Sequence, residues 1–126
     1  MRSLSLEEVI YIHSEVVKET GGSDGIRDRG LLDSAVNTPF QSFGGYDVYP
    51  EIYDKAARLG FSLAENHAFV DGNKRIAVIA VLEFLSANGI EIDCTESELS
   101  SMFYKLAASE VTFEDLVKWI KGHEAH

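Results

Sequence analysis

Apolar residues recur along much of this chain at intervals of three and four, the spacing that places side chains on one face of an α-helix. The first such segment follows Ser5, which stands three residues before Glu8 in the capping-box pattern, and Gly21-Gly22 supplies its stop. Its apolar face is formed by Leu6, Val9, Ile10, His13, Val16 and Val17. A lone histidine on such a face is more often a hydrogen-bonded core residue than a catalyst.

Two further helices are expected before the centre of the chain. Asp28 suits the N-cap of a short helix that Pro39 ends. Pro50 fits the first turn of the next helix, which should run to about Asn66, because proline lacks the N–H that is unpaired there. Gly60 inside this helix indicates close packing against a neighbour.

The most apolar segment is Ile76–Leu85, inside a predicted helix from about Gly72 to Asn88. The first two turns of that segment are apolar on every side, which is typical of a helix that other helices surround. We therefore expect this helix to be the buried centre of the fold.

The C-terminal third carries two more capping boxes. Thr95 and Thr112 each stand three residues before an acidic residue and precede apolar residues at helical spacing. His123 and His126 fall in a tail that we expect to be frayed, and they do not form the helical zinc pattern. The sequence thus predicts one all-α domain, residues 1–126, of about six helices packed around a central one.

Outside the helices, Pro39–Pro50 (PFQSFGGYDVYP) is rich in aromatic residues around Gly44-Gly45. This pattern favours a short β-hairpin, which would offer an exposed edge to an extended peptide. A loop whose aromatic side chains enter the core is an equal alternative. Ile90–Cys94 is expected to be a short connector, in part extended.

Composition limits the classes of function. Eleven basic and 21 acidic residues give a net charge of −10, which argues against a nucleic-acid or membrane-binding surface but not against a small nucleotide pocket. Cys94 is the single cysteine, so no intramolecular disulfide can form, and a small buried apolar role is favoured for it. No signal peptide or membrane span is evident, and a cytoplasmic setting is expected.

The Gly-rich segment GGSDGIRDRG suggests a phosphate-binding loop at first sight. It lacks the Gly-Lys-Ser/Thr ending and no strand precedes it, so that interpretation fails. Arg27 and Arg29 within it either are solvated or face an anionic ligand, and the first option is favoured.

The candidate chemistry lies in His67–Arg75, just before the apolar centre. The first amides of a helix point outward unpaired and favour anions, and Lys74 and Arg75 would add positive charge. Asp71 is placed to hold Mg²⁺ between phosphate oxygens, and His67 is placed to take a proton from an attacking hydroxyl. Alternatively the segment is only a turn and an N-cap, but cations at a helix N-terminus oppose its dipole and call for an anion.

This segment resembles the signature of the Fic/Doc family. The positions that match are His67, Phe69, Asp71, Gly72, Asn73 and Arg75. The segment Gly21–Ala35 is similar to the N-terminal part of the Doc branch. The resemblance implies a compact helical domain and transfer from Mg²⁺-bound ATP, as phosphate or as AMP, to a hydroxyl of a protein.

Roles follow from the resemblance. It implies that His67 is the catalytic general base, Asp71 the metal ligand, and Gly72, Asn73, Lys74 and Arg75 the phosphate site. Phe69 would anchor the motif in the core, and the hairpin would be a flap that aligns the target segment.

Two positions separate the branches of the family. AMP-transferring members usually have glycine where Lys74 stands and a second arginine where Val78 stands, whereas Doc-like toxins resemble this chain at both. The implied function is therefore a toxin kinase that phosphorylates a Ser or Thr of a translation factor of the elongation factor Tu type. Gly72 is similar to the AMP-transferring branch, which keeps AMP transfer as the alternative.

The family also implies restraint by an inhibitory helix. The nearest similar segment, Ser62–Asn66, has the wrong spacing, so we expect a separate antitoxin protein. A third hypothesis, a helical module that binds a partner without catalysis, gives no reason for both His67 and Asp71.

Overall fold

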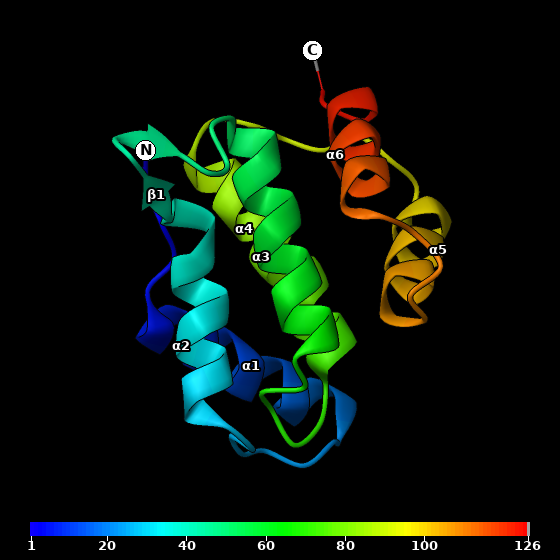
Figure 1. Cartoon of the computed structure of the whole chain (residues 1–126). Helices are drawn as coiled ribbons and strands as arrows, with labels where there is room; N and C mark the ends of the chain where they lie inside the picture. Colours follow the sequence, from blue (N-terminus) through cyan, green and yellow to red (C-terminus); the bar gives the residue numbers. More distant parts are fainter. Residues whose placement is uncertain (126) are drawn as a thin grey trace.

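The computed structural model describes residues 1–125, which form six α-helices and one antiparallel hairpin (Figure 1). The helices are α1 (Leu6–Thr20), α2 (Arg29–Asn37), α3 (Ile52–Glu65), α4 (Asn73–Ala87), α5 (Glu96–Ala107) and α6 (Phe113–Gly122). A 3-10 turn, η1 (Thr38–Phe40), leads from α2 to the strands β1 (Ser42–Phe43) and β2 (Tyr46–Asp47). The prediction of an all-α fold with a short hairpin is confirmed.

Capping explains where most helices begin. Ser5, Asp28, Thr95 and Thr112 each accept a hydrogen bond from a backbone N–H in the first turn, as predicted. The prediction for Pro50 is wrong, because α3 begins at Ile52 with the preceding residue as its N-cap. The Asp54 carboxylate accepts the N–H of that N-cap residue at 3.1 Å and so fixes the helix start two residues after the proline.

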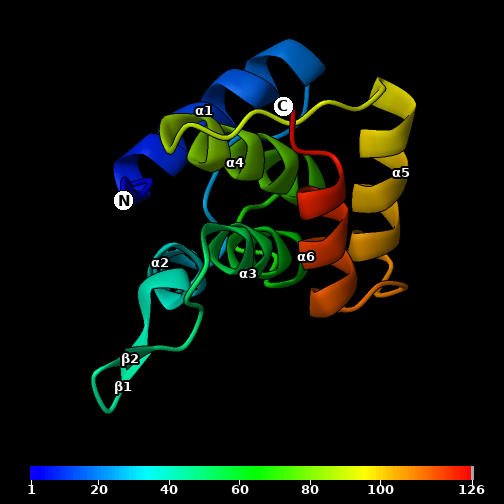
Figure 2. The same ribbon diagram turned by 90° about the horizontal axis from the view of Figure 1, so that it is seen from above.

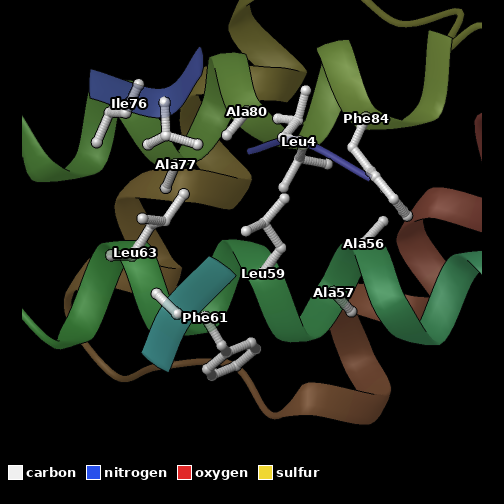
Figure 3. Close-up of a cluster of buried hydrophobic side chains, with 14 of the residues drawn as sticks. Leu4, Ala56, Ala57, Leu59, Phe61, Leu63, Ile76, Ala77, Ala80 and Phe84 are labelled. Atoms are coloured by element: carbon white, nitrogen blue, oxygen red, sulfur yellow. The ribbon is translucent and has the colours of Figure 1, made fainter. Parts of the chain in front are cut away.

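Helices α3 and α4 form an antiparallel pair at the centre of the molecule (Figure 1). Figure 3 shows Leu59 and Leu63 of α3 facing Ile76, Ala77 and Ala80 of α4, and all five are buried. The close approach depends on Gly60 of α3, where an added Cβ would lie 2.8 Å from Val81 Cγ2. The prediction of tight packing at this glycine is confirmed.

The remaining helices cover this pair from different sides. Figure 2 shows α1 beside α4, α2 beside α3, and α5 with α6 grouped at one end. The prediction that α4 is surrounded on every side is wrong, since Val78, Ile79 and Leu82 are only half-buried. Its buried residues are Ile76, Ala77, Ala80, Val81, Phe84 and Leu85. Helices α1, α3 and α5 cover this part of α4 and leave the face with Val78, Ile79 and Leu82 partly exposed.

The C-terminal segment is ordered by the connector between α4 and α5. The N–H of Asp93 donates to the carbonyl of His123 at 2.6 Å, and the N–H of Ala125 donates to that of Glu91 at 2.8 Å. The prediction of a frayed tail is therefore wrong at His123, which is half-buried and lies 3.2 Å from a Glu98 oxygen. His126 lies outside the described residues.

Cys94 in the same connector is half-buried, and burial together with the nearby Glu98 and Asp93 carboxylates raises the pKa of its thiol. A raised pKa disfavours the reactive thiolate, in agreement with a packing role. Within the described part of the chain, no helix has the length and apolar character needed to cross a membrane.

Candidate functional site

The loop between α3 and α4 carries the motif, and a second loop supports it. Both lie at the lower end of the molecule in Figure 1. Ala68 O accepts the N–H of Arg27 at 2.7 Å and that of Asp28 at 3.0 Å, and the N–H of Val70 donates to Gly25 O at 3.0 Å. The Gly-rich segment after α1 therefore holds the motif loop through its backbone.

Phe69 fixes the motif loop to the core. Its side chain is 1% exposed and stacks on the His13 ring of α1, with 3.7 Å between ring centroids. Nε2 of His13 also donates to the carbonyl oxygen of Asp71 at 2.6 Å. His13 is thus a buried, hydrogen-bonded residue, as the sequence indicated, and it contacts the motif directly.

Asn73, the first residue of α4, closes the loop with its side chain. Its Oδ1 accepts the N–H of Phe69 at 3.0 Å, and its Nδ2 donates to the carbonyl of Phe69 at 3.1 Å. These two bonds hold the Asn73 amide group against the Phe69 backbone, and the backbone N–H of Asn73 at the start of α4 is available to a ligand. The sequence predicts Asn73 near phosphate, and its second role in closing the loop is not evident from the sequence.

His67 is exposed and has a left-handed backbone, with φ of 51°. That conformation is strained by about 1–3 kcal/mol in a residue other than glycine and is frequent at functional sites. Arg27 supports it, because Nε donates to His67 O at 2.6 Å and Nη2 donates to Asn66 O at 3.1 Å. Arg27 is therefore bound to the backbone of the motif, which neither sequence interpretation of this arginine included.

The Asp71 carboxylate lies at the mouth of the same loop. Its Oδ1 accepts the N–H of Gly72 at 2.9 Å, and its Oδ2 accepts the N–H of Ser23 at 3.3 Å. Gly22 lies directly beside it, and an added Cβ there would lie 2.8 Å from Oδ2 and would displace the carboxylate. Each oxygen keeps a further lone pair, so the carboxylate retains the capacity to bind a cation.

A magnesium ion fits this donor set. Among residues 1–125 no group of three or more histidine, cysteine or acidic side chains is arranged to hold a metal. Mg²⁺ in nucleotide sites is commonly held by one or two carboxylates, with water and phosphate oxygens completing the shell. Asp71 alone is sufficient for that pattern.

Helix α4 begins without a side-chain cap. Its N-cap is Gly72, with φ of 76°, and its first turn contains no acidic residue. The amides of Asn73, Lys74 and Arg75 belong to the first turn, where no carbonyl four residues earlier is available. An added Cβ at Gly72 would face His13 Nε2 at 3.5 Å and not the ligand side of the loop. Glycine is therefore explained by the left-handed backbone of the turn, and not by a need to leave space for a ligand.

A cleft of about 560 Å³ joins these groups. Its lining from the motif is His67, Val70, Asp71, Gly72, Asn73, Lys74 and Arg75. Helix α1 contributes Val17 and Thr20, and α5 contributes Ala107. Six of the seven residues singled out from the sequence thus line one cavity, and Phe69 lies buried beneath it.

The hairpin lies away from the cleft, at the other end of α3 (Figures 1 and 2). Helix α3 has 14 residues, so the two ends are about 21 Å apart at 1.5 Å per residue. Phe43 and Tyr46 in the hairpin are 85% and 80% exposed. The position does not agree with the expected role of a flap over the site.

A model of the Fic/DOC family matches residues 3–85, which include both loops and α4 up to Leu85. The chain belongs to the Fic/Doc family. The protein "Toxin Doc" of Mycolicibacterium smegmatis is 39% identical over 107 residues, 83% of this chain and 82% of that protein. "Protein kinase doc" of Escherichia phage P1 is 26% identical over 121 residues, 96% of this chain and 94% of that protein. Both Fic/Doc relatives align along most of their length.

Proposed function

We propose that this Fic/Doc protein is a toxin kinase that transfers the γ-phosphoryl group of ATP to a Ser or Thr hydroxyl of a translation factor. The proposed target is of the elongation factor Tu type, and its phosphorylation would halt protein synthesis. The observation that carries the proposal is the cleft that joins exposed His67 to the open N-terminus of α4. The names of the two relatives, a toxin and a protein kinase, support the same class.

In the proposed reaction the target hydroxyl attacks the γ-phosphorus and ADP leaves. His67 takes the hydroxyl proton on a ring nitrogen as the new O–P bond forms. The first amides of α4 and the Arg75 guanidinium hold the phosphate oxygens, and Lys74 adds a positive charge. Mg²⁺ bound at Asp71 would neutralise part of the phosphate charge. Positioning and charge stabilisation of this kind account for most catalysis of phosphoryl transfer.

AMP transfer is the competing reaction, and the residue at position 78 favours phosphoryl transfer. Val78, where the AMP-transferring branch usually has arginine, is half-buried and packs against the core, so it offers no second cation. Gly72 has a left-handed backbone, so the presence of glycine there is explained without AMP transfer.

The test uses ATP labelled separately at the α- and γ-phosphorus, with Mg²⁺ and a bacterial lysate. We expect γ-label, and no α-label, on one lysate protein, and loss of label when Mg²⁺ is chelated. His67→Ala should lower the transfer by about 10²–10⁴-fold without unfolding the protein. Label from α-labelled ATP would establish AMP transfer, and no label from either would favour a non-catalytic binding module.

We also propose that a separate antitoxin covers the cleft. One relative is named a toxin, and such a protein needs a partner that restrains it in its own cell. Expression of the parent should arrest growth, and expression of His67→Ala should not. Growth arrest by both proteins would show that toxicity does not depend on His67.

A further inference from the structure

Arg27 reaches the motif from the Gly-rich loop, outside the cleft. Its guanidinium donates to two successive carbonyls, from Nε to His67 O at 2.6 Å and from Nη2 to Asn66 O at 3.1 Å. The planar fork of arginine suits two such acceptors, and a single ammonium does not. The side chain is exposed, and it is not among the residues that line the cavity.

The backbone pairing of the two loops does not reach these carbonyls. The main-chain bonds connect Arg27 and Asp28 to Ala68 O, and Gly25 O to the N–H of Val70. Within the described residues, the carbonyls of Asn66 and His67 receive a hydrogen bond only from the Arg27 side chain. The two carbonyls that flank the φ angle of His67 are therefore held by this one side chain.

His67 needs such support because its backbone is strained. With φ of 51° it has left the regions that a histidine ordinarily occupies, and relaxation toward negative φ would turn the ring away from its present direction. Hydrogen bonds on the carbonyls before and after this φ angle oppose that relaxation. They act on the direction of the ring and leave the first turn of α4 unchanged.

We propose that Arg27 is a positioning residue for the reaction, which holds the His67 backbone in its left-handed conformation and so aims the imidazole into the cleft. The inference rests on the proposed function of His67 as the base. It differs from a role as an anion ligand, since Arg27 does not line the cavity and its fork is occupied by carbonyls.

The kinetic test compares four proteins: the parent, Arg27→Ala, Arg27→Lys and Arg29→Ala. Arg29 is an exposed arginine two residues away and serves as the matched control for charge. For Arg27→Ala we expect kcat to fall by about 10–10²-fold while KM for ATP stays within about threefold, because the phosphate groups of α4 are untouched. Arg27→Lys should recover part of kcat, since lysine can reach one carbonyl, and Arg29→Ala should match the parent.

A second readout needs no activity. In protein labelled at histidine, the His67 ring signal is assigned by its absence in His67→Ala. We expect that signal to shift or broaden in Arg27→Ala, while the signals of the other histidines and all signals of Arg29→Ala coincide with the parent.

The two readouts separate the possible failures. A His67 signal unchanged in Arg27→Ala would overturn the positioning role, whether or not phosphate is transferred. A raised KM with unchanged kcat would make Arg27 an anion ligand instead. If the parent transfers no label at all, the proposed function fails, and the signal of His67 still decides whether Arg27 holds it.

Discussion

Helix α4 and helices α5 and α6 begin in opposite ways. Thr95 and Thr112 start α5 and α6 with complete capping boxes, and acidic residues occupy their first turns. Helix α4 starts at a left-handed glycine, has no side-chain cap and carries Lys74 and Arg75 in its first turn. In α5 and α6 side chains of the protein accept hydrogen bonds from N–H groups of the first turn, whereas in α4 no side chain of residues 1–125 does so.

The two kinds of helix start differ in their contribution to the stability of the protein. A capping side chain stabilises a helix by about 1 kcal/mol, and an exposed cation near the N-terminus opposes the dipole by about 0.3–1 kcal/mol. The start of α4 is therefore less stable in the free protein than it would be with an ordinary cap. A bound anion would make the two cations stabilising at the start of α4, which is the reason to regard Lys74 and Arg75 as part of a phosphate site.

The largest expected effect separates binding from stability at α4. Arg75→Ala should lower phosphate transfer by about 10²–10³-fold, because a charged donor to the phosphate is lost. The same change should raise the free energy of unfolding by about 0.3–1 kcal/mol in the absence of ATP. Transfer assays and denaturant unfolding measure the two effects.

Lys105 is the matched control, because it lies in the last turn of α5, where a cation is favourable. Lys105→Ala should lower stability by a few tenths of a kcal/mol and leave transfer unchanged. A loss of stability in both variants would contradict the difference between the two helix ends.

The next effect concerns the turn into α4. Gly72→Ala should lower the free energy of unfolding by about 1–2 kcal/mol, because alanine is strained at φ of 76°. Gly122, at the end of α6, has no positive φ and no neighbour within 4 Å of an added Cβ. Gly122→Ala should therefore be neutral or stabilising by up to about 1 kcal/mol. If denaturant unfolding showed equal losses of stability in Gly72→Ala and Gly122→Ala, the left-handed turn at Gly72 would not be the reason for glycine there.

Sequence reasoning succeeded where the physics is local. The capping residues Ser5, Thr95 and Thr112 act within a few residues of their own positions, and the structure confirms all three. The prediction was wrong where two helix starts compete. Pro50 favours a start at its own position, but the hydrogen bond from the Glu51 N–H to Asp54 makes Glu51 the N-cap.

The support of the motif could not be found from spacing. Arg27 and His67 are 40 residues apart, and His13 and Asp71 are 58 apart, so only the fold brings them together. The place of the hairpin at the far end of α3 likewise depends on the path of the whole chain. The motif residues themselves were found because they occupy nine successive positions.

A smaller effect is expected at the capped end. Thr112→Ala should lower the free energy of unfolding by about 1 kcal/mol, because the N–H of Asp115 loses its acceptor. Transfer of phosphate should not change, since α6 does not line the cleft. Reduced transfer at unchanged stability would show that α6 takes part in the site.

The smallest expected effect is a loss of stability at low pH, and it follows from the carboxylates of the capping boxes. The backbone N–H of Thr95, then the His123 side chain, lowers the pKa of Glu98, and the backbone N–H of Thr112 lowers that of Asp115. A lowered pKa gives stability that is present above the ordinary value, 4.5 for glutamate, and is lost as the pH falls through the folded value. Stability should thus decline below about pH 4.5. Glu98→Gln should flatten this decline, and an unchanged slope would contradict the assignment.

The most direct measurement of the central claim is a calorimetric titration of the parent and of Arg75→Ala with ATP and Mg²⁺. If the open start of α4 is the phosphate site, the parent binds and the variant binds at least about tenfold more weakly, although it is the more stable of the two without ligand. Equal affinities for the two proteins would contradict the claim that α4 is left uncapped for an anion.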